Sequence, residues 1–328
     1  MTAPGPAGRR RSHPIEERAF HRWLARTLPA GSEGLLPLGD DAAAVRLPPG
    51  TVPVVTTDAL VEGTHFLRGS PPSLIGAAAS AVSLSDVAAK GAAPLAVFLA
   101  LILPRGSDRR WSEALVRGAE RTAARFGAHV LGGDTKPGPW PVVVSTVVGA
   151  ARPQRLVGRT GARPGDLLVT TGEVGRGGVA ARDLAAPGRA RGAAVAAMLQ
   201  FEPRVREGIA LAGSAHAMLD TSDGLAEGVH LLAAASGVRV VVDEARLPIV
   251  AEARRLPVRA RRAATFYGGD YELLATVPPA RLATAERAVR RVGGRLTRIG
   301  AVTPGRGAFL SARSKTLPMP EPGWRSFA

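Results

Sequence analysis

Six aspartates are the residues of this sequence best suited to do chemistry. Each lies at the end of a predicted strand, in a loop or on the apolar side of a predicted helix: Asp41, Asp58, Asp86, Asp134, Asp220 and Asp223. Carboxylates that gather without neighbouring lysine or arginine repel one another unless a cation binds between them. Oxygen ligands favour Mg²⁺ or Ca²⁺ over zinc, and Mg²⁺ is commonly shared with a phosphate. The set predicts a site for several magnesium ions and a phosphorylated ligand.

Taken singly, most of these residues have an ordinary structural explanation. Asp41 could belong to a turn, and Asp58 could cap a helix. Asp86 differs, because it lies four residues after Val82 on the apolar stripe of a predicted helix. A buried acid needs a partner. Asp86 is therefore the strongest single indication of a metal site.

The hydrophobic pattern predicts alternating strands and helices around these acids. Expected helices cover residues 14–28, 73–90, 107–126 and a segment ending at 235, and expected strands cover residues 51–58, 95–103, 129–131, 141–150, 166–171, 238–242 and a segment beginning within 267–273. The glycine-rich turn 172–178 could hold a phosphate or allow close packing of a helix on a strand. Because neither a P-loop nor a dinucleotide pattern is present, we favour packing.

Length and composition limit the class of protein. The 328 residues suggest two domains, and we place the boundary within a connector at 152–163, after a tail at 1–13 that we expect to be disordered. No cysteine is present, so thiolate metal sites and cysteine nucleophiles are excluded. We find neither a signal peptide nor an apolar run long enough to span a bilayer, which predicts a cytoplasmic protein without membrane attachment.

The net charge of +16 raises the question of nucleic-acid binding. Arginines account for most of the excess and are scattered along the chain. The clusters 9–11 and 259–262 are not interleaved with stacking aromatic residues. We therefore expect no specific nucleic-acid partner, and a positive field would also suit an anionic small molecule.

Taken together, the acidic motifs resemble the thiamine-monophosphate kinase family. They follow one another in order over nearly the whole chain after residue 14: Gly39-Asp40-Asp41, residues 56–66, Leu84-Ser85-Asp86, Gly132-Gly133-Asp134-Thr135, residues 220–225 and Asp270-Tyr271-Glu272-Leu273. The resemblance implies an α/β (α+β) fold of the aminoimidazole ribonucleotide synthetase type, with two domains of mixed sheets flanked by helices. It further implies a homodimer, with ATP and magnesium binding and dimerisation assigned to residues 14–151 and a second α/β domain at 152–328.

The reaction implied by the resemblance moves the γ-phosphate of ATP directly onto thiamine phosphate, without a covalent enzyme intermediate. The positions that match magnesium ligands are Asp41, Thr56, Thr57, Asp58, Asp86, Asp134, Asp220 and Asp223. Nucleotide-binding positions match Gly133, Asp134, Arg159 and Ser222, and acceptor-binding positions match His65, Gly269 and Trp324. Singly, Arg159 could be a surface residue, Ser222 a helix cap, His65 a structural loop residue and Trp324 packing of the tail.

Two positions depart from the pattern of the family. Gly269 stands where the family usually has glutamate, a residue on the acceptor side, and Lys136 stands where a threonine is common. Because side chains alternate along a strand, Glu272 would point away from Gly269 if the strand already begins there. The nucleotide half of the site is intact, so the departure concerns the acceptor.

Other functions remain open at this point. The chain could be a relative of these kinases that uses Mg-ATP on a different small acceptor, or a protein that binds Mg-nucleotide without turnover. Selenophosphate synthetase and the hydrogenase-maturation dehydratase fit less well, because both depend on cysteine or selenocysteine. ATP consumption with and without thiamine phosphate distinguishes the kinase from the binding protein.

Overall fold

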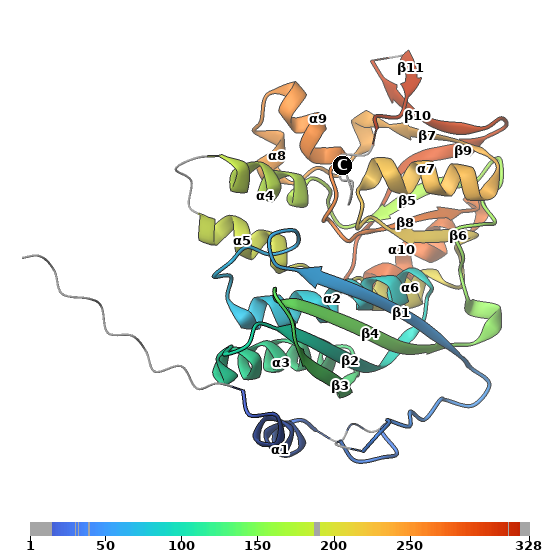
Figure 1. Ribbon diagram of the computed structural model, residues 1–328. Coiled ribbons are helices and arrows are strands. Elements are labelled where there is room, and N and C mark those ends of the chain that lie inside the picture. Colours follow the sequence, from blue (N-terminus) through green and yellow to red (C-terminus); the bar gives the residue numbers. More distant parts are fainter. Residues whose placement is uncertain are drawn as a thin grey trace, which may run out of the picture.

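We analysed a computed structural model of the protein, which describes residues 15–29, 31, 33–38, 40–186, 191–313 and 315–321. The predicted disordered tail at 1–13 and the predicted acceptor contact Trp324 lie outside the described residues, as does Gly39 of the first acidic motif. Figure 1 shows two layered halves, with the sheet of the first half below that of the second and helix α2 between them.

The first half is built on a four-stranded sheet with the order β1-β4-β2-β3 within the described residues. Strand β4 pairs antiparallel with both β1 and β2, and β2 pairs parallel with β3. The strands are β1 (Val52–Val61), β2 (Ala93–Leu103), β3 (His129–Pro137) and β4 (Val142–Ala151). Side chains alternate across β4, where Val143 and Val147 are fully buried while Val144 and Val148 are partly exposed. One face of the sheet therefore holds the core.

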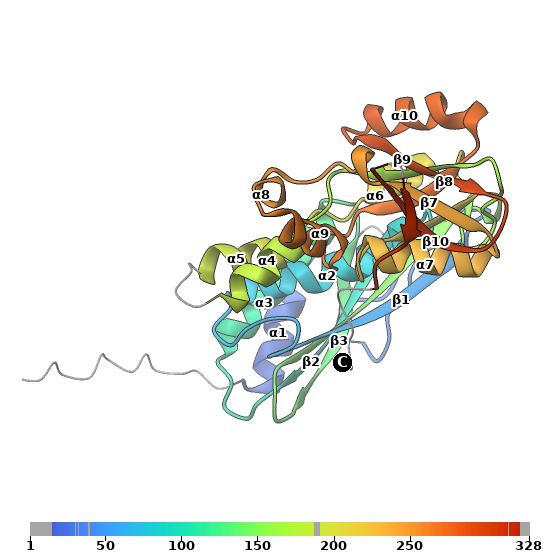
Figure 2. The same cartoon turned by 90° about the horizontal axis from the view of Figure 1, so that it is seen from above.

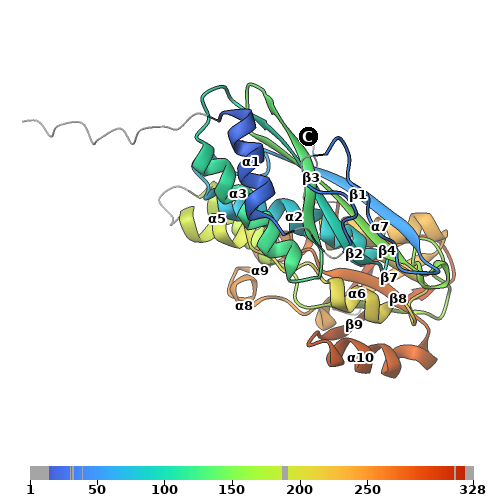
Figure 3. The ribbon, with the colours of Figure 1, turned by 90° about the horizontal axis from the view of Figure 1, so that it is seen from below.

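Helices α2 (Pro72–Ala89) and α3 (Arg109–Ala124) cover that buried face, close to the spans that the apolar pattern predicts. Helix α3 begins after Asp108, whose carboxylate accepts a hydrogen bond of 2.9 Å from the amide of Arg110. Helix α1 (Glu17–Thr27) lies alongside α3 in Figure 3. The guanidinium of Arg117 on α3 stands 5.0 Å from the ring centre of Trp23 on α1. The predicted apolar face of α1 is in place, with Phe20 fully buried.

Strand β3 is longer than predicted. The sequence suggests a strand of three residues followed by a glycine loop, but pairing with β2 continues through Asp134 to Pro137. The register shifts between Val97 and Phe98 of β2, which leaves Leu131 as an extra residue on β3. The pairing thus carries the Gly132-Gly133-Asp134 motif along the edge of the sheet instead of into a loop.

The second half contains, among the described residues, a seven-stranded mixed sheet with the order β11-β10-β7-β9-β5-β8-β6. Its strands are β5 (Leu167–Thr171), β6 (Ala217–Asp220), β7 (Arg239–Asp243), β8 (Leu273–Val277), β9 (Leu296–Thr303), β10 (Gly307–Ala312) and β11 (Lys315–Pro318). Strand β8 begins at Leu273, so the predicted strand start within 267–273 lies at the very end of that range. Residues 268–272 have no regular secondary structure.

The helices of the second half are α4 (Arg176–Ala185), α5 (Arg191–Leu199), α6 (Val205–Leu211), α7 (Leu225–Ser236), α8 (Ala251–Arg254), α9 (Val258–Phe266) and α10 (Leu282–Arg291). Seen from above in Figure 2, α4, α5, α8 and α9 gather at one end of the molecule. Helix α4 packs on both α5 and α9.

Helix α2 joins the two halves. It contacts β1, β4 and α3 in the first half and β6 and α6 in the second, and the Ser85 hydroxyl donates a hydrogen bond of 2.7 Å to Asp220. Contrary to our expectation from the sequence, α2 is long and apolar enough to cross a membrane by length and composition. Its apolar surface is mostly buried inside the protein, because a helix between two sheets needs apolar residues on several sides.

Candidate functional site

Four of the six predicted aspartates meet in one cleft where the two halves join. Asp58 comes from β1, Asp86 from α2, Asp220 from the end of β6, and Asp223 from the turn before α7. The cleft measures about 400 Å³. Arg159, Ser222, His65 and Gly269, which the sequence also proposes, line the same cleft. The fold thus collects the predicted residues from distant parts of the chain.

Hydroxyl groups orient these carboxylates. Thr56 donates a hydrogen bond of 2.6 Å to Asp86, and Ser83 donates one of 2.9 Å to Asp58. Asp220 accepts from Ser85 at 2.7 Å and from Ser222 at 3.0 Å. Hydroxyls rather than cationic side chains therefore make the close polar contacts of Asp58, Asp86 and Asp220.

The electrostatics of the cleft favour a bound cation. Burial, followed by the neighbouring Asp86 and to a lesser extent Asp223, raises the pKa of Asp58 to about 6 against the opposing hydrogen bond from Ser83. Burial likewise raises the pKa of Asp220 to about 6, with Asp86 as the next cause. Asp58 and Asp220 therefore resist ionising next to the other carboxylates of the cleft. A divalent cation would remove that repulsion.

No three acidic or histidine side chains of the described residues are already arranged to hold one ion. Mg²⁺ is commonly held by one or two carboxylates together with water and phosphate oxygens. The oxygen-only donor set formed by Thr56 and the four carboxylates thus fits magnesium ions held jointly with a phosphorylated ligand.

The remaining predicted metal ligands lie elsewhere in the chain. Asp41, Gly133 and Asp134 line a second cavity of about 450 Å³ bounded by α1 and β3. Asp134 pairs in register with Ala100 and, through β4, with Ala59. Three strand spacings of ~4.8 Å place its backbone roughly 14 Å from β1. One chain therefore does not bring Asp41 and Asp134 to the four-carboxylate cleft.

Thr57 and Asp134 also differ in their surroundings from the cleft residues. Thr57 is exposed on the open face of the sheet, where its hydroxyl lies 2.9 Å from that of Thr146. Asp134 accepts a hydrogen bond of 2.7 Å from Lys136, which is the main reason why the pKa of Asp134 is lowered. Lys136, the second departure from the family pattern, thus neutralises a predicted metal ligand on the same strand.

His65 stands at the junction of the cleft with an apolar cavity of about 270 Å³. The backbone amide of Val61 donates a hydrogen bond of 3.1 Å to His65 Nδ1. Burial lowers the pKa of His65 despite the opposing effect of this bond. The neutral imidazole is therefore favoured, and its other nitrogen carries the ring proton.

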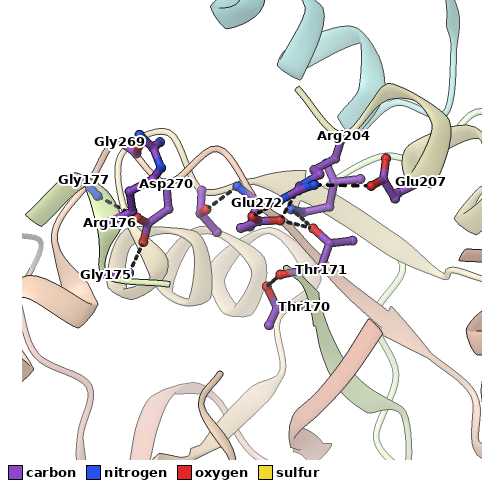
Figure 4. A network of polar contacts seen from close by, with 12 residues as sticks. Thr170, Thr171, Gly175, Arg176, Gly177, Arg204, Glu207, Gly269, Asp270 and Glu272 are labelled. Carbon is purple, nitrogen blue, oxygen red and sulfur yellow. Dashed lines mark hydrogen bonds and ion pairs between the residues drawn. The ribbon is translucent and has the colours of Figure 1, made fainter. Parts of the chain in front are cut away.

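The glycine-rich turn 172–178 serves packing, as the sequence favours. The amides of Gly175 and Gly177 donate hydrogen bonds of 2.7 and 2.9 Å to the carboxylate of Asp270 (Figure 4). The anion position at the start of α4 is thus filled by the chain itself. A Cβ on Gly177 would lie 2.1 Å from the carbonyl oxygen of Gly268, so only glycine allows this approach.

Gly269 does not lie in a strand, so the condition for the alternation argument about Glu272 is not met. Its backbone has φ +89°, a left-handed conformation that glycine adopts easily. Its carbonyl accepts a hydrogen bond of 2.5 Å from Arg176. Glu272 is instead held by Arg204 through hydrogen bonds of 2.6 and 2.8 Å. Its carboxylate is thus paired within the protein, and Glu272 is not among the residues that line the cleft.

Sequence reasoning missed three residues near the acids. Phe201 and Tyr271 line the cleft, and Lys90 at the end of α2 donates a hydrogen bond of 3.3 Å to the carbonyl of Met218. Burial, followed by the nearby Arg159, lowers the pKa of Lys90. Tyr271 belongs to a recognised motif, whereas Phe201, between α5 and α6, carries no signal in the sequence.

Comparison with known proteins defines the class. Residues 39–151 match the model of the AIR synthase related protein, N-terminal domain, and residues 163–312 match that of the AIR synthase related protein, C-terminal domain. The two matches together define a two-domain AIR synthase related protein, which confirms the predicted mixed α/β fold.

The chain also resembles individual kinases over most of its length. It is 35% identical to a thiamine-monophosphate kinase of Caulobacter vibrioides, with 92% of this chain and 88% of the relative covered. It is 40% identical to one of Halobacterium salinarum, with coverages of 81% and 87%. The chain belongs to the thiamine-monophosphate kinase family.

Solved structures of the family share the fold. The crystal structure of the kinase from Stenotrophomonas maltophilia has a TM-score of 0.78 at 32% identity, and the match covers 91% of this chain and 96% of that one. AaThiL complexed with AMPPCP and TMP has a TM-score of 0.72 at 28% identity, with coverages of 84% and 88%. The match therefore extends over both sheets.

Proposed function

We propose that this protein transfers the terminal phosphoryl group of ATP to thiamine phosphate, giving ADP and thiamine diphosphate. The observation that carries the proposal is the cleft in which Asp58, Asp86, Asp220 and Asp223 meet between the two halves. Membership of the family and the relative complexed with AMPPCP and TMP support the choice of substrates. A cytoplasmic location is consistent with such a reaction.

Magnesium ions would be held by Thr56, Asp58, Asp86, Asp220 and Asp223. When bound, they would neutralise phosphate charge and align the two substrates. In the metal-free cleft the same carboxylates would repel a nucleotide. Nucleotide affinity should therefore fall sharply in EDTA, and calorimetry showing undiminished ATP affinity without divalent metal would contradict the shared site.

Direct transfer needs positioning more than covalent chemistry, and the described side chains can supply it. A phosphate oxygen of the acceptor attacks the γ-phosphorus, the bond to the β-phosphate oxygen breaks, and ADP leaves. Arg159, which is exposed on the cleft wall, would contact the nucleotide together with Ser222. His65 and Gly269 would face the acceptor, and Trp324 would complete that side. No covalent nucleophile is required.

A homodimer would explain the open face of the first sheet. Val55 is 61% exposed there, and Val144, Val148 and Phe98 are partly exposed on the same face by register. Figure 1 shows α2 and α3 on the opposite side. Exposed apolar side chains gathered on one face are typical of an interface. We therefore assign dimerisation, with nucleotide and metal binding, to residues 14–151, and the other side of the cleft to residues 152–328.

The same dimer would account for the separation of the predicted ligands. Asp134 and Thr57 belong to the face that we propose to be buried, so Asp134 of the partner subunit could approach Thr57 and Asp58. Asp41 of the partner subunit would follow, because it shares a cavity with Asp134. Each active site would then contain residues of both subunits.

Subunit mixing tests this arrangement. Asp86→Asn and Asp134→Asn should each be inactive alone, because both active sites of a dimer made of one variant carry the substitution. Random reassembly of equal amounts should restore about a quarter of wild-type activity, since about half of the dimers are mixed and each mixed dimer has one intact site. A mixture as inactive as its components would contradict the shared site, and Asp86→Asn mixed with Asp58→Asn serves as the control without recovery.

The activity itself is tested with purified protein, ATP, Mg²⁺ and a panel of acceptors. Thiamine phosphate should give ADP and thiamine diphosphate in equal amounts, and tubes with thiamine or without acceptor should give neither. Because Gly269 replaces an acceptor-side glutamate, the panel includes other small phosphorylated acceptors. If the enzyme prefers one of those acceptors, that acceptor and not thiamine phosphate is its substrate. Nucleotide binding without ADP release would favour a non-catalytic protein.

A further inference from the structure

Tyr271 lies between two acids that are both turned away from the cleft and fixed to the scaffold. Asp270 accepts hydrogen bonds from the amides at the start of α4. Glu272 accepts from Arg204 on one side and from the Thr171 hydroxyl at 2.7 Å. Figure 4 shows these two anchored groups on either side of the segment. The acids of this motif therefore hold the backbone on both sides of Tyr271.

The backbone held in this way is strained at the tyrosine. Tyr271 has φ +56°, one of the two left-handed conformations at residues other than glycine in the described chain. A bulky side chain avoids this conformation, which persists when the surroundings impose it and which clusters at functional sites. The anchors of Asp270 and Glu272 impose it here, and the strained turn lets Tyr271 line the cleft.

The tyrosine ring is fixed by stacking. It lies 3.7 Å from the ring of Phe201, centre to centre, at an angle of 6°. The guanidinium of Arg176 stands 5.7 Å from the centre of the Phe201 ring and also holds the carbonyl of Gly269. Both rings line the cleft with the four aspartates. A side chain held by an anchored backbone and a stacked ring is suited to hold a ligand in position.

The hydroxyl of Tyr271 is a hydrogen-bond donor at neutral pH. The ordinary pKa of tyrosine is about 10, so the phenol keeps its proton. Within the part of the chain that the structure describes, this hydroxyl makes no hydrogen bond, although Asp58 and Asp220 line the same cleft. The group is therefore available to an oxygen acceptor that enters the cleft.

We propose that Tyr271 is a catalytic residue whose hydroxyl donates a hydrogen bond to an oxygen of the phosphoryl group during transfer. This proposal rests on the proposed function, because it requires phosphate groups between Asp58 and Asp220. Tyr271 keeps its proton throughout and forms no bond to phosphorus. Its contribution is to stabilise the charge that spreads over the phosphoryl oxygens in the transition state.

The test is Tyr271→Phe, which removes the hydroxyl and keeps the stacked ring. We expect kcat to fall about 10- to 100-fold, equivalent to about 1.4–2.8 kcal/mol, with the KM values for ATP and acceptor changed less than about threefold and an unchanged Tm. A kcat within twofold of wild type, or a loss confined to KM, would overturn the proposal. Tyr271→Leu, which also removes the stack, should lower the Tm.

A binding measurement separates this proposal from the identity of the acceptor. Calorimetry measures the affinity for two ligands, each in the presence of Mg²⁺ and without acceptor. The first is ADP together with aluminium fluoride, which mimics the phosphoryl group in transfer, and the second is AMPPCP. Tyr271→Phe should weaken the first about 10- to 100-fold and leave the second unchanged. Equal affinities of the variant and the wild type for both would reject the role of Tyr271, even where the wild type makes thiamine diphosphate. If the wild type makes none, the proposed function fails and this comparison still decides the role of the tyrosine.

Discussion

Replacing Asp220 with asparagine should stabilise the metal-free protein. Asp220 is 8% exposed, and burial together with Asp86 raises its pKa from 3.8 to about 6. Two pKa units correspond to about 3 kcal/mol of free energy that folding loses when this carboxylate ionises. The hydroxyls of Ser85 and Ser222 already oppose the shift, and asparagine retains an oxygen that can accept from one of them.

The sign of the pH dependence follows from the raised pKa. The folded protein holds the Asp220 proton more tightly than the unfolded chain, so stability falls as the pH rises from about 4 to about 6. In EDTA, Asp220→Asn should exceed wild type in free energy of unfolding by about 1 kcal/mol at pH 4.5 and by about 3 kcal/mol at pH 8. Mg²⁺ should stabilise wild type and have little effect on the variant.

Urea denaturation in EDTA at the two pH values measures these differences. Asp183→Asn is the matched control, because Asp183 pairs with Arg182 at 3.4 Å on the surface of α4 and its replacement should not stabilise the protein. An Asp220→Asn protein less stable than wild type at pH 8 in EDTA would refute the reasoning. It would mean that the ionised carboxylate is satisfied in the folded chain without a cation.

Three further predictions concern the surroundings of the cleft. Gly269→Glu and Gly269→Ala should each lose about 1–2 kcal/mol of stability in thermal unfolding, because residue 269 has a left-handed backbone. The acceptor KM should be lower for Gly269→Glu than for Gly269→Ala. Equal KM values of the two variants would contradict a place for Gly269 on the acceptor side. Arg204→Met leaves Glu272 buried without its cation and should lower the free energy of unfolding, measured in urea, by about 3 kcal/mol. Adding Glu272→Gln to this variant should restore part of the lost stability. Losses that simply add in the double variant would contradict the pairing of Arg204 with Glu272. Binding to duplex DNA or RNA should be no tighter than ~10⁻⁶ M at physiological salt, and sub-micromolar binding would identify the positive charge as a nucleic-acid surface.

Residues whose environment follows from local periodicity could be predicted from the sequence. Asp86 is an example, because its position on the apolar stripe of α2 already requires a partner. The apolar runs of β2 and β4 and the helices that cover them also follow from the pattern. The sequence lacks a phosphate-binding motif at the glycine-rich turn and therefore favours a packing role for it. In the structure, the carboxylate of Asp270 accepts the hydrogen bonds of the amides in this turn.

Contacts between distant segments could not be predicted in the same way. The length of β3 depends on its pairing with β2, and the loop before β8 depends on the anchors of Asp270 and Glu272. Phe201 reaches the cleft only because the second half folds back on α2. The separation of Asp134 from Asp58 follows from the strand order of the first sheet, in which β1 and β3 are at opposite edges. The order of the motifs along the sequence does not give this strand order.

The central claim is that the four-carboxylate cleft carries out magnesium-dependent phosphoryl transfer. Formation of thiamine diphosphate from ATP and thiamine phosphate, measured for wild type and Asp86→Asn over a full titration of Mg²⁺, tests it most directly. We expect wild type to turn over in proportion to bound Mg²⁺ and the variant, folded by circular dichroism, to give no product at any concentration. Turnover of Asp86→Asn close to wild type at saturating Mg²⁺ would contradict the account.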